Sequence, residues 1–110
     1  FILGPALAMR LGAGFVPARR QGKLPAATER VAYELEYGLA ALHVHTDAII
    51  PGARVVVHDD LIATGGTAAA LGEIVERLGG EVVAYAFLFE LTALSGRTRL
   101  DAPTHALIDF

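Results

Sequence analysis

Two adjacent carboxylates and a loop of small residues form the most chemically suggestive stretch of this 110-residue chain. Asp59 and Asp60 follow a run of valines, and a Thr-Gly-Gly-Thr loop occupies residues 64–67. Carboxylates only accept hydrogen bonds, so they repel a phosphate but bind the hydroxyl groups of a sugar. Glycines let an anion approach the backbone N–H groups closely, and the threonine hydroxyls add donors. Together these residues predict a site for a ribose 5-phosphate.

The residues around this stretch predict a strand, a turn and a helix in that order. Val55, Val56 and Val57 form a continuous β-branched run, which is typical of a strand buried on both faces. Apolar residues then recur at the spacing of an amphipathic helix, at Leu71, Ile74, Val75 and Leu78. The first N–H groups of a helix have no internal partner and carry partial positive charge, which favours an anion. The loop also falls at the carboxyl end of a strand, where open α/β sheets bind ligands.

The rest of the chain alternates predicted strands and helices, the order of an α/β protein with a parallel sheet. We expect a strand end at residues 1–3, a helix from Gly4 that ends at Gly12 or Gly14, and a short strand at Phe15 and Val16. The later expected elements are a β-hairpin over 31–46, a strand over 81–90 preceded by the helix cap Gly79-Gly80, a short helix or turn over 92–100, and a strand over 105–110.

Composition limits the classes of protein to which the chain can belong. An apolar content of 54% suits an α/β core, and a net charge of −3 offers no basic surface for nucleic acid. The longest apolar run, residues 82–89, is too short to cross a membrane. The absence of cysteine excludes thiolate chemistry and fits the cytoplasm. The chain opens at Phe1 in what looks like the middle of a strand, so we expect its N-terminal part to be missing.

A cationic loop and an acidic strand offer further candidate residues. Arg19, Arg20 and Lys23 lie close together beside the breaker Gly22, which is compatible with a solvated loop or with neutralisation of a second phosphate. Glu36 belongs to an alternating segment, so it faces either the solvent side of a hairpin or a ligand.

The histidines have two interpretations each. His43 and His45, with Asp47, could hold a metal ion, but two histidines on a strand face are more often polar surface, and we predict no metal site made by the protein. His58 interrupts the buried strand, where it is either a core histidine bonded to a neighbour or a group that tunes Asp59.

Several segments resemble one enzyme family. Residues 55–67 resemble the phosphoribosyl pyrophosphate (PRPP) motif of the type I phosphoribosyltransferases. Within that group the chain is similar to the adenine phosphoribosyltransferases, on the segments Gly14-Phe15-Val16-Pro17, Gly22-Lys23-Leu24-Pro25, Tyr33-Glu34-Leu35-Glu36-Tyr37-Gly38, Asp47-Ala48, Pro51-Gly52 and Glu90-Leu91.

The resemblance implies a fold and an activity. It implies an α/β, parallel-sheet type I phosphoribosyltransferase fold over residues 1–110, a single domain incomplete at its N-terminus, with a flexible β-hairpin flap over about residues 17–47. Such enzymes are cytoplasmic homodimers of purine salvage that transfer the 5-phosphoribosyl group from PRPP to adenine, giving AMP and pyrophosphate, with Mg²⁺ carried mainly by PRPP. A phosphoribosyltransferase for another purine such as xanthine, and a non-catalytic PRPP-sensing regulator, remain alternatives.

Matching the family's motifs assigns roles to individual residues. Glu36 is implied as the catalytic residue that faces the base near N7. Pyrophosphate contacts are implied for Arg19, Lys23 and Tyr37, and ribose hydroxyl contacts for Asp59 and Asp60. The 5-phosphate is implied to lie on Ala63, Thr64, Gly65, Gly66 and Thr67. In the family the segment ahead of Phe1 carries the base-binding hood, which leaves open whether this chain alone turns over.

Overall fold

The computed structural model describes the backbone of residues 3–20, 28–35 and 38–110, and the side chains of residues 3–19 and 42–110. The elements in chain order are α1 (Gly4–Leu11), β1 (Arg19–Arg20), β2 (Thr28–Leu35), β3 (Gly38–His45), β4 (Arg54–Ile62), α2 (Gly66–Arg77), β5 (Glu81–Glu90), the short 3₁₀ helices η1 (Thr92–Leu94) and η2 (Gly96–Arg99), and β6 (Thr104–Asp109). The predicted α/β class, hairpin, crossover helix and later strands are therefore confirmed, with the last strand beginning one residue earlier than expected.

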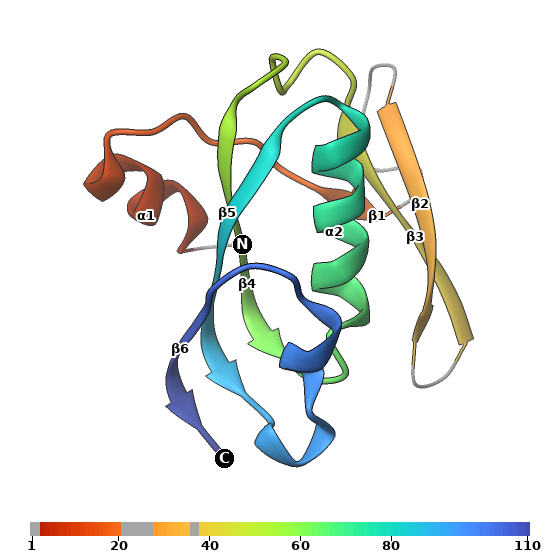
Figure 1. The fold of residues 1–110 in the computed structure, drawn as a ribbon, viewed down its shortest axis with the longest axis vertical. Helices are drawn as coiled ribbons and strands as arrows, with labels where there is room; N and C mark the ends of the chain where they lie inside the picture. Colours follow the sequence, from red (N-terminus) through yellow and green to blue (C-terminus); the bar gives the residue numbers. More distant parts are fainter. Residues whose placement is uncertain (1–2, 21–27, 36–37) are drawn as a thin grey trace.

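The strands β4, β5 and β6 form a parallel sheet in that order (Figure 1). Their carboxyl ends therefore lie at the same edge of the sheet. Helix α2 connects β4 to β5, and its end is set by Gly79, whose φ is 90°. The N–H of Gly79 donates to Glu76 O at 3.0 Å, and the N–H of Gly80 donates to Val75 O at 2.9 Å, so the predicted glycine cap is confirmed.

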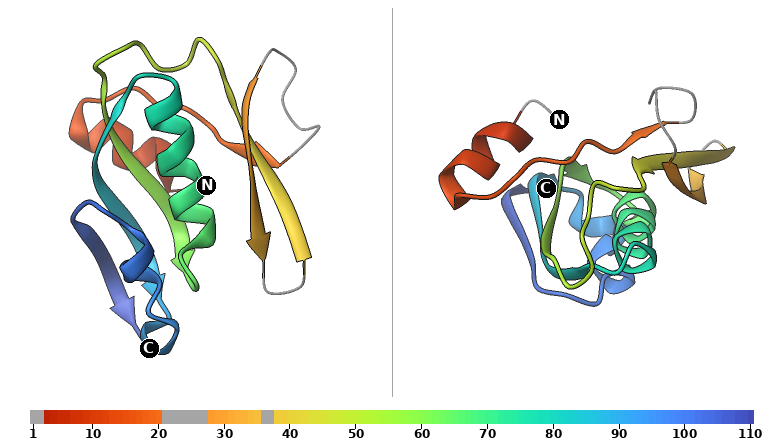
Figure 2. Two further views of the ribbon diagram at one scale, coloured as in Figure 1. Left: turned by 45° about the vertical axis from the view of Figure 1, so that its right-hand side comes forward. Right: turned by 90° about the horizontal axis from the view of Figure 1, so that it is seen from above.

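Helix α2 packs between the parallel sheet and the β2–β3 hairpin (Figures 1 and 2). One side of α2 contributes Ala68 and Val75 to a core shared with the sheet. The other side contributes Ala70 and the fully buried Ile74 to a second core shared with β3. Because α2 is held on two sides, the position of its N-terminus is determined by both layers. Neither described helix combines the length and the apolar character that crossing a membrane requires.

The predicted strand at Phe15 and Val16 is wrong. Residues 13–18 run without regular structure, and the short strand β1 begins only at Arg19. Pro17 has no N–H to donate to a ladder, which explains why pairing starts beyond it. Phe15 instead packs against the start of α1, where a Cβ on Gly4 would lie 2.5 Å from Phe15 Cε1. Leu3 lies in the turn before α1, and the expected strand end at residues 1–2 falls outside the described residues.

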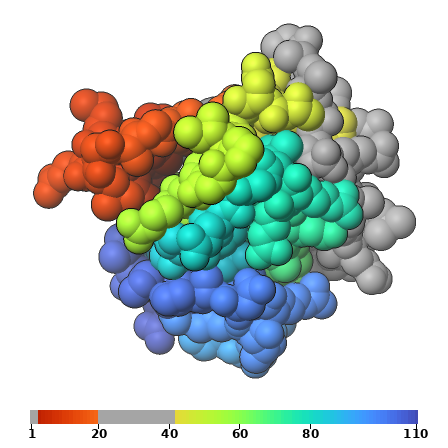
Figure 3. Space-filling model, turned by 45° about the horizontal axis from the view of Figure 1, so that its top comes forward, coloured from red at the N-terminus to blue at the C-terminus, as the bar shows by residue number. Residues whose placement is uncertain are grey.

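The prediction that the valine strand is buried on both faces is also wrong. Val57 is 5% exposed, whereas the neighbouring Val56 is 36% exposed. The reason is that α2 covers only one face of β4 in the described part of the chain. Figure 3 shows the segment that carries α1 at the side of the molecule, beside the chain that leads into β4.

Candidate functional site

The loop between β4 and α2 has the backbone shape expected of an anion-binding turn. Gly65 precedes the first residue of α2 in the left-handed conformation, with φ at 85°. Only glycine adopts that conformation readily, which explains the residue type at this position. The first turn of α2 contains no acidic residue. The partial positive charge of this helix end is therefore not neutralised by the helix itself.

Backbone donors at the start of α2 are largely unused. The N–H of Gly66 meets Thr64 Oγ1 at a long 3.4 Å, the outer limit of a hydrogen bond. Among the hydrogen bonds of the described residues, none is donated by the N–H of Gly65 or Thr67. Gly65 and Gly66 are both buried. Buried N–H groups without acceptors are rare in proteins, so this loop has donors available for an anion.

The back of the loop rests on η2, a contact that the sequence did not predict. A Cβ on Gly65 would collide with the carbonyl oxygen of Gly96. A Cβ on Gly96 would lie 2.5 Å from Ala63 O and 3.0 Å from Gly65 N. The two segments therefore approach backbone to backbone. A glycine following an apolar strand by six residues is the only signal in the sequence, and it is too weak to identify such a contact.

Asp59 and Asp60 occupy different environments although they are adjacent. Asp59 is half-buried, whereas Asp60 is exposed. The N–H of Asp60 donates to Asp59 Oδ1 at 2.8 Å. Burial raises the pKa of the Asp59 carboxyl above its ordinary value, the Asp60 N–H opposes that rise, and the Asp60 carboxylate adds to it. No Lys or Arg pairs with Asp59 among the side chains that the structure describes, so its acceptor oxygens remain available for hydroxyl groups.

Glu90, at the end of β5, differs from Asp59 because it is paired with an arginine. Its residue exposure is 6%, and both carboxylate oxygens accept hydrogen bonds from Arg97, from Nε at 2.7 Å and from Nη2 at 2.8 Å. Arg97 Nη1 donates to the Thr104 carbonyl at 2.5 Å. Hydrogen bonding to Arg97 holds the pKa of Glu90 below its ordinary value, and the same bond raises the pKa of Arg97.

His58 is the core histidine of the two predicted alternatives. Its Nδ1 donates to the Ala86 carbonyl on β5 at 2.9 Å. A carbonyl only accepts hydrogen bonds, so the ring carries its proton on Nδ1. Nε2 is buried and has no partner in the described part of the chain. His58 is not among the groups that shift the pKa of Asp59.

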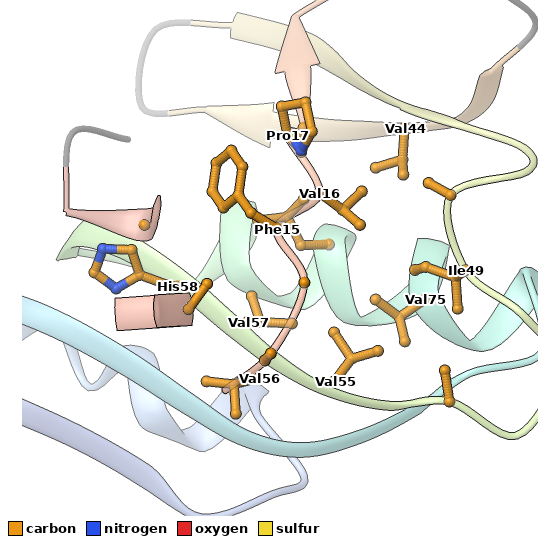
Figure 4. A pocket seen from close by; sticks show the side chains of 18 of the residues that line it. Phe15, Val16, Pro17, Val44, Ile49, Val55, Val56, Val57, His58 and Val75 are labelled. Carbon is orange, nitrogen blue, oxygen red and sulfur yellow. The ribbon is translucent and has the colours of Figure 1, made fainter. Parts of the chain in front are cut away.

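A cavity of about 640 Å³ lies beside β4 (Figure 4). Valines of β4, Phe15 and Val75 of α2 form its apolar wall, and His58 lies at one end. Of the predicted site residues that the structure describes, only Asp59 and Thr67 line the cavity, so it reaches the loop but extends mostly along apolar surface. We assign it no ligand, because its lining gives few polar groups to orient one.

The structure brings together one part of the predicted site. Asp59, Asp60 and the loop from Ala63 to Thr67 lie together at the carboxyl edge of the sheet. Arg19 pairs with His43 across β1 and β3, in the other sheet, and its side chain is exposed. Lys23, Glu36 and Tyr37 lie outside the described residues.

Mg²⁺ prefers oxygen ligands, and carboxylates are the relevant side chains near the loop. No group of three or more His, Asp or Glu side chains that could hold a metal ion occurs among the described residues. Asp59 and Asp60 together provide two carboxylates, one fewer than such a group requires. Oxygen donors suit Mg²⁺, which commonly keeps water and substrate phosphates as ligands. The described side chains alone therefore do not form a cage for Mg²⁺.

The arrangement places the chain in a class. A parallel sheet, with paired carboxylates where β4 ends and open amides where the crossover helix begins, is the type I phosphoribosyltransferase fold. No protein-family model matches the chain. The chain is 55% identical over 111 residues to an adenine phosphoribosyltransferase of Chloroflexus aurantiacus, a match that covers all of this chain and 64% of that protein.

Solved structures agree with this class. The structure matches a crystal structure of adenine phosphoribosyltransferase from Rhodothermus marinus with a TM-score of 0.95 and 56% identity, over 100% of this chain and 64% of that one. It matches the Saccharomyces cerevisiae adenine phosphoribosyltransferase, complexed with an imino-altritol bisphosphate and adenine, with a TM-score of 0.93 and 48% identity, over 97% of this chain and 61% of that one. The chain belongs to the adenine phosphoribosyltransferase family. It spans 64% of the length of the Chloroflexus relative.

Proposed function

We propose that the protein carrying this chain is a cytoplasmic enzyme that transfers the 5-phosphoribosyl group of PRPP to adenine, giving AMP and pyrophosphate. The observation that carries the proposal is the pair of buried glycines at the start of α2, whose N–H groups have few acceptors among the described residues. Such donors at a helix N-terminus suit a phosphate. Support also comes from relatives about half identical in sequence that are named for this activity.

In this proposal the loop from Ala63 to Thr67 holds the 5-phosphate, and Asp59 and Asp60 accept hydrogen bonds from the ribose hydroxyls. The available amides and the positive end of α2 would supply the binding energy for the phosphate. Anchoring both ends of the ribose phosphate places C1 of the sugar in a defined position. Positioning and charge neutralisation, not covalent chemistry, would then supply most of the rate enhancement.

The remaining predicted residues complete the proposal. The chain forms one phosphoribosyltransferase domain, and its flap of about residues 17–47 closes over the substrates and excludes water. Arg19, Lys23 and Tyr37 would contact pyrophosphate on closure. Glu36 would accept a proton from adenine as the base attacks C1, a contribution of about 10²- to 10⁴-fold. Mg²⁺ carried by PRPP would neutralise the pyrophosphate charge. As in the family, we propose that the protein acts as a homodimer.

A synthesis assay on the full-length protein tests this proposal. The protein is incubated with PRPP and Mg²⁺ and, in separate reactions, with adenine, hypoxanthine, guanine or xanthine. We expect a nucleotide product only with adenine. A product with xanthine alone would change the substrate, and PRPP binding without any product would favour a regulator. A Glu36→Gln variant is expected to lower kcat while leaving PRPP binding near normal, and equal loss of both would show that Glu36 is structural.

A further inference from the structure

The shape of the proposed phosphate loop depends on a segment about thirty residues later in the chain. Gly65 and Gly96 approach each other with no side chain between them, and a Cβ on either residue would meet the backbone of the opposite segment. Ala63 O lies on the same contact surface. A displacement of Gly96 would therefore move Ala63 and Gly65 directly, because no flexible side chain lies between the two backbones to absorb it.

Glu90 and Arg97 hold this later segment in place. Arg97 directly follows Gly96 and binds both oxygens of Glu90. The backbone of Glu90 is itself held on two sides, since the N–H of Phe110 donates to Glu90 O at 2.9 Å and the N–H of Leu91 donates to Ile62 O at 3.0 Å. The contact therefore runs from the sheet through the Glu90 carboxylate and the Arg97 guanidinium to the backbone of Gly96.

Most of the hydrogen-bond donors of Arg97 are used within the protein. Its Nε and Nη2 donate to Glu90, and its Nη1 donates to the Thr104 carbonyl. Three of its five N–H donors are therefore used within the protein. The guanidinium and the carboxylate also cancel in charge, so the pair adds little to the attraction of an anion. What the pair supplies is a rigid two-nitrogen contact, which fixes both the distance and the orientation of the guanidinium.

We infer that Glu90 and Arg97 are positioning residues for the phosphate loop: by holding Gly96 against Gly65 and Ala63, they keep the loop amides aimed at the 5-phosphate of the substrate. This inference rests on the proposed function. It predicts that changes to the pair weaken binding of the substrate that carries the phosphate and leave binding of the base unchanged. A role in stability alone would not make that distinction.

The test uses two conservative variants of the full-length protein and a matched control pair. Arg97→Lys keeps the charge but loses the two-nitrogen geometry, and Glu90→Gln keeps the shape but loses the charge. Glu73 and Arg77 form the control, because Arg77 Nη2 donates to Glu73 Oε1 at 2.8 Å on the exposed side of α2. Arg77→Lys and Glu73→Gln therefore make the same chemical changes in an ion pair that does not contact the loop.

Steady-state kinetics separate positioning from stability. We expect Arg97→Lys and Glu90→Gln to raise KM for PRPP by about 10-fold, since a small displacement of several amide donors weakens a charged ligand strongly. KM for adenine should remain within about 2-fold, and the control variants should change neither value. The inference is overturned if the Arg97 and Glu90 variants match the controls, or if they lower kcat at unchanged KM for PRPP.

A binding measurement distinguishes failure of this inference from failure of the proposed function. The probe is ribose 5-phosphate, titrated while the amide resonances of Gly65 and Gly66 are followed by NMR. In the wild-type protein we expect both resonances to shift, and in Arg97→Lys the midpoint should move to about 10-fold higher concentration. Binding without AMP synthesis would refute the proposed function and leave the positioning role standing. If the wild-type protein makes AMP but Arg97→Lys has the same midpoint as the wild type, only the positioning role is refuted.

Discussion

Asp59 and Glu90 lie near the carboxyl ends of neighbouring parallel strands, yet their carboxylates differ in burial, in hydrogen-bond partners and in the direction of their pKa shifts. Glu90 is almost fully buried and binds a guanidinium with both oxygens, which lowers its pKa. Asp59 is half-buried, and burial raises its pKa. One carboxylate is satisfied by the fold. The other is left with acceptor capacity beside backbone donors that the protein does not use.

Under the proposed function, the region around Glu90 serves the fold and the region around Asp59 serves a ligand. A protein gains stability when a buried charge has its partner, as Glu90 has in Arg97. It loses stability when a charged group is buried without a counter-charge, as at Asp59, which has none among the described side chains and whose pKa is raised by burial. Such local losses are expected at functional sites, where the missing partner is supplied by a substrate. The predictions below test this division in order of decreasing effect.

The largest effect is expected from Gly65→Ala, which forces the two regions apart. The new Cβ collides with Gly96 O, and the left-handed φ of 85° is strained for alanine. Because the loop must move to relieve the collision, we expect kcat/KM for PRPP to fall by about 100-fold or more. The measurement is steady-state kinetics of AMP synthesis by the full-length protein.

Gly52→Ala is the matched control for this change. Gly52 has almost the same φ, 84°, but a Cβ there would meet nothing within 4 Å. It should therefore show only the strain of the left-handed conformation, about 1 kcal/mol of unfolding free energy, with activity near that of the wild type. Equal loss of activity in both variants would show that strain, not the contact with Gly96, determines the behaviour of Gly65.

The second effect concerns the carboxylate that serves the fold. Glu90→Gln removes the charge that pairs with Arg97, so we expect the free energy of unfolding at neutral pH to fall by about 2 kcal/mol. The pKa of Glu90 is lowered from 4.5, so its contribution is present above that value and is lost as the pH falls through the folded-state pKa. Denaturant unfolding from pH 7 to pH 3 should therefore show the wild type and the variant converging at acid pH. A pH-independent difference would contradict the ionic role of the pair.

The sequence predicted the strand, turn and helix around the proposed phosphate loop better than the segment that supports this loop. The motif from Val55 to Thr67 was readable because each of its functions requires a particular residue type in one short segment: acceptors, glycines, then a helix start. Gly79 was readable for the same reason, since a helix that ends in a left-handed turn needs glycine. Local requirements of this kind leave a local signal.

Contacts between distant segments left no such signal. The Glu90–Arg97 pair joins a strand end to a turn, and the Gly65–Gly96 contact joins segments far apart in the chain. Each depends on the tertiary arrangement, which residue spacing does not reveal. The prediction of a strand at Phe15 was wrong for a different reason: packing against Gly4 overrode the β propensity of Phe15. Val56 was expected to be buried because it belongs to a valine run. The expectation was wrong because such a run does not indicate how many faces of a strand are covered.

The third effect separates recognition of the sugar from recognition of the phosphate. Asp60 is exposed, so Asp60→Asn should leave stability near that of the wild type. A carboxylate that accepts from ribose hydroxyls contributes about 1.4 kcal/mol, so we expect about a 10-fold weaker affinity for PRPP and unchanged affinity for inorganic phosphate. Isothermal titration calorimetry with both ligands measures the two values. Parallel weakening of both would place Asp60 at the phosphate and not at the sugar.

The smallest effect is expected from Asp59→Asn, which tests the comparison most directly. Asp59→Asn should raise the free energy of unfolding at pH 7, whereas Glu90→Gln should lower it. The pKa of Asp59 is raised from 3.8, so ionised Asp59 lowers stability once the pH rises through the folded-state pKa. Asp59→Asn should therefore stabilise the protein at pH 7, by no more than about 1 kcal/mol because solvent screens a half-buried group, and the gain should vanish below pH 3.8. PRPP affinity should fall in the same variant. Loss of stability at pH 7 would show that Asp59, like Glu90, serves the fold, and the division between the two regions would not hold.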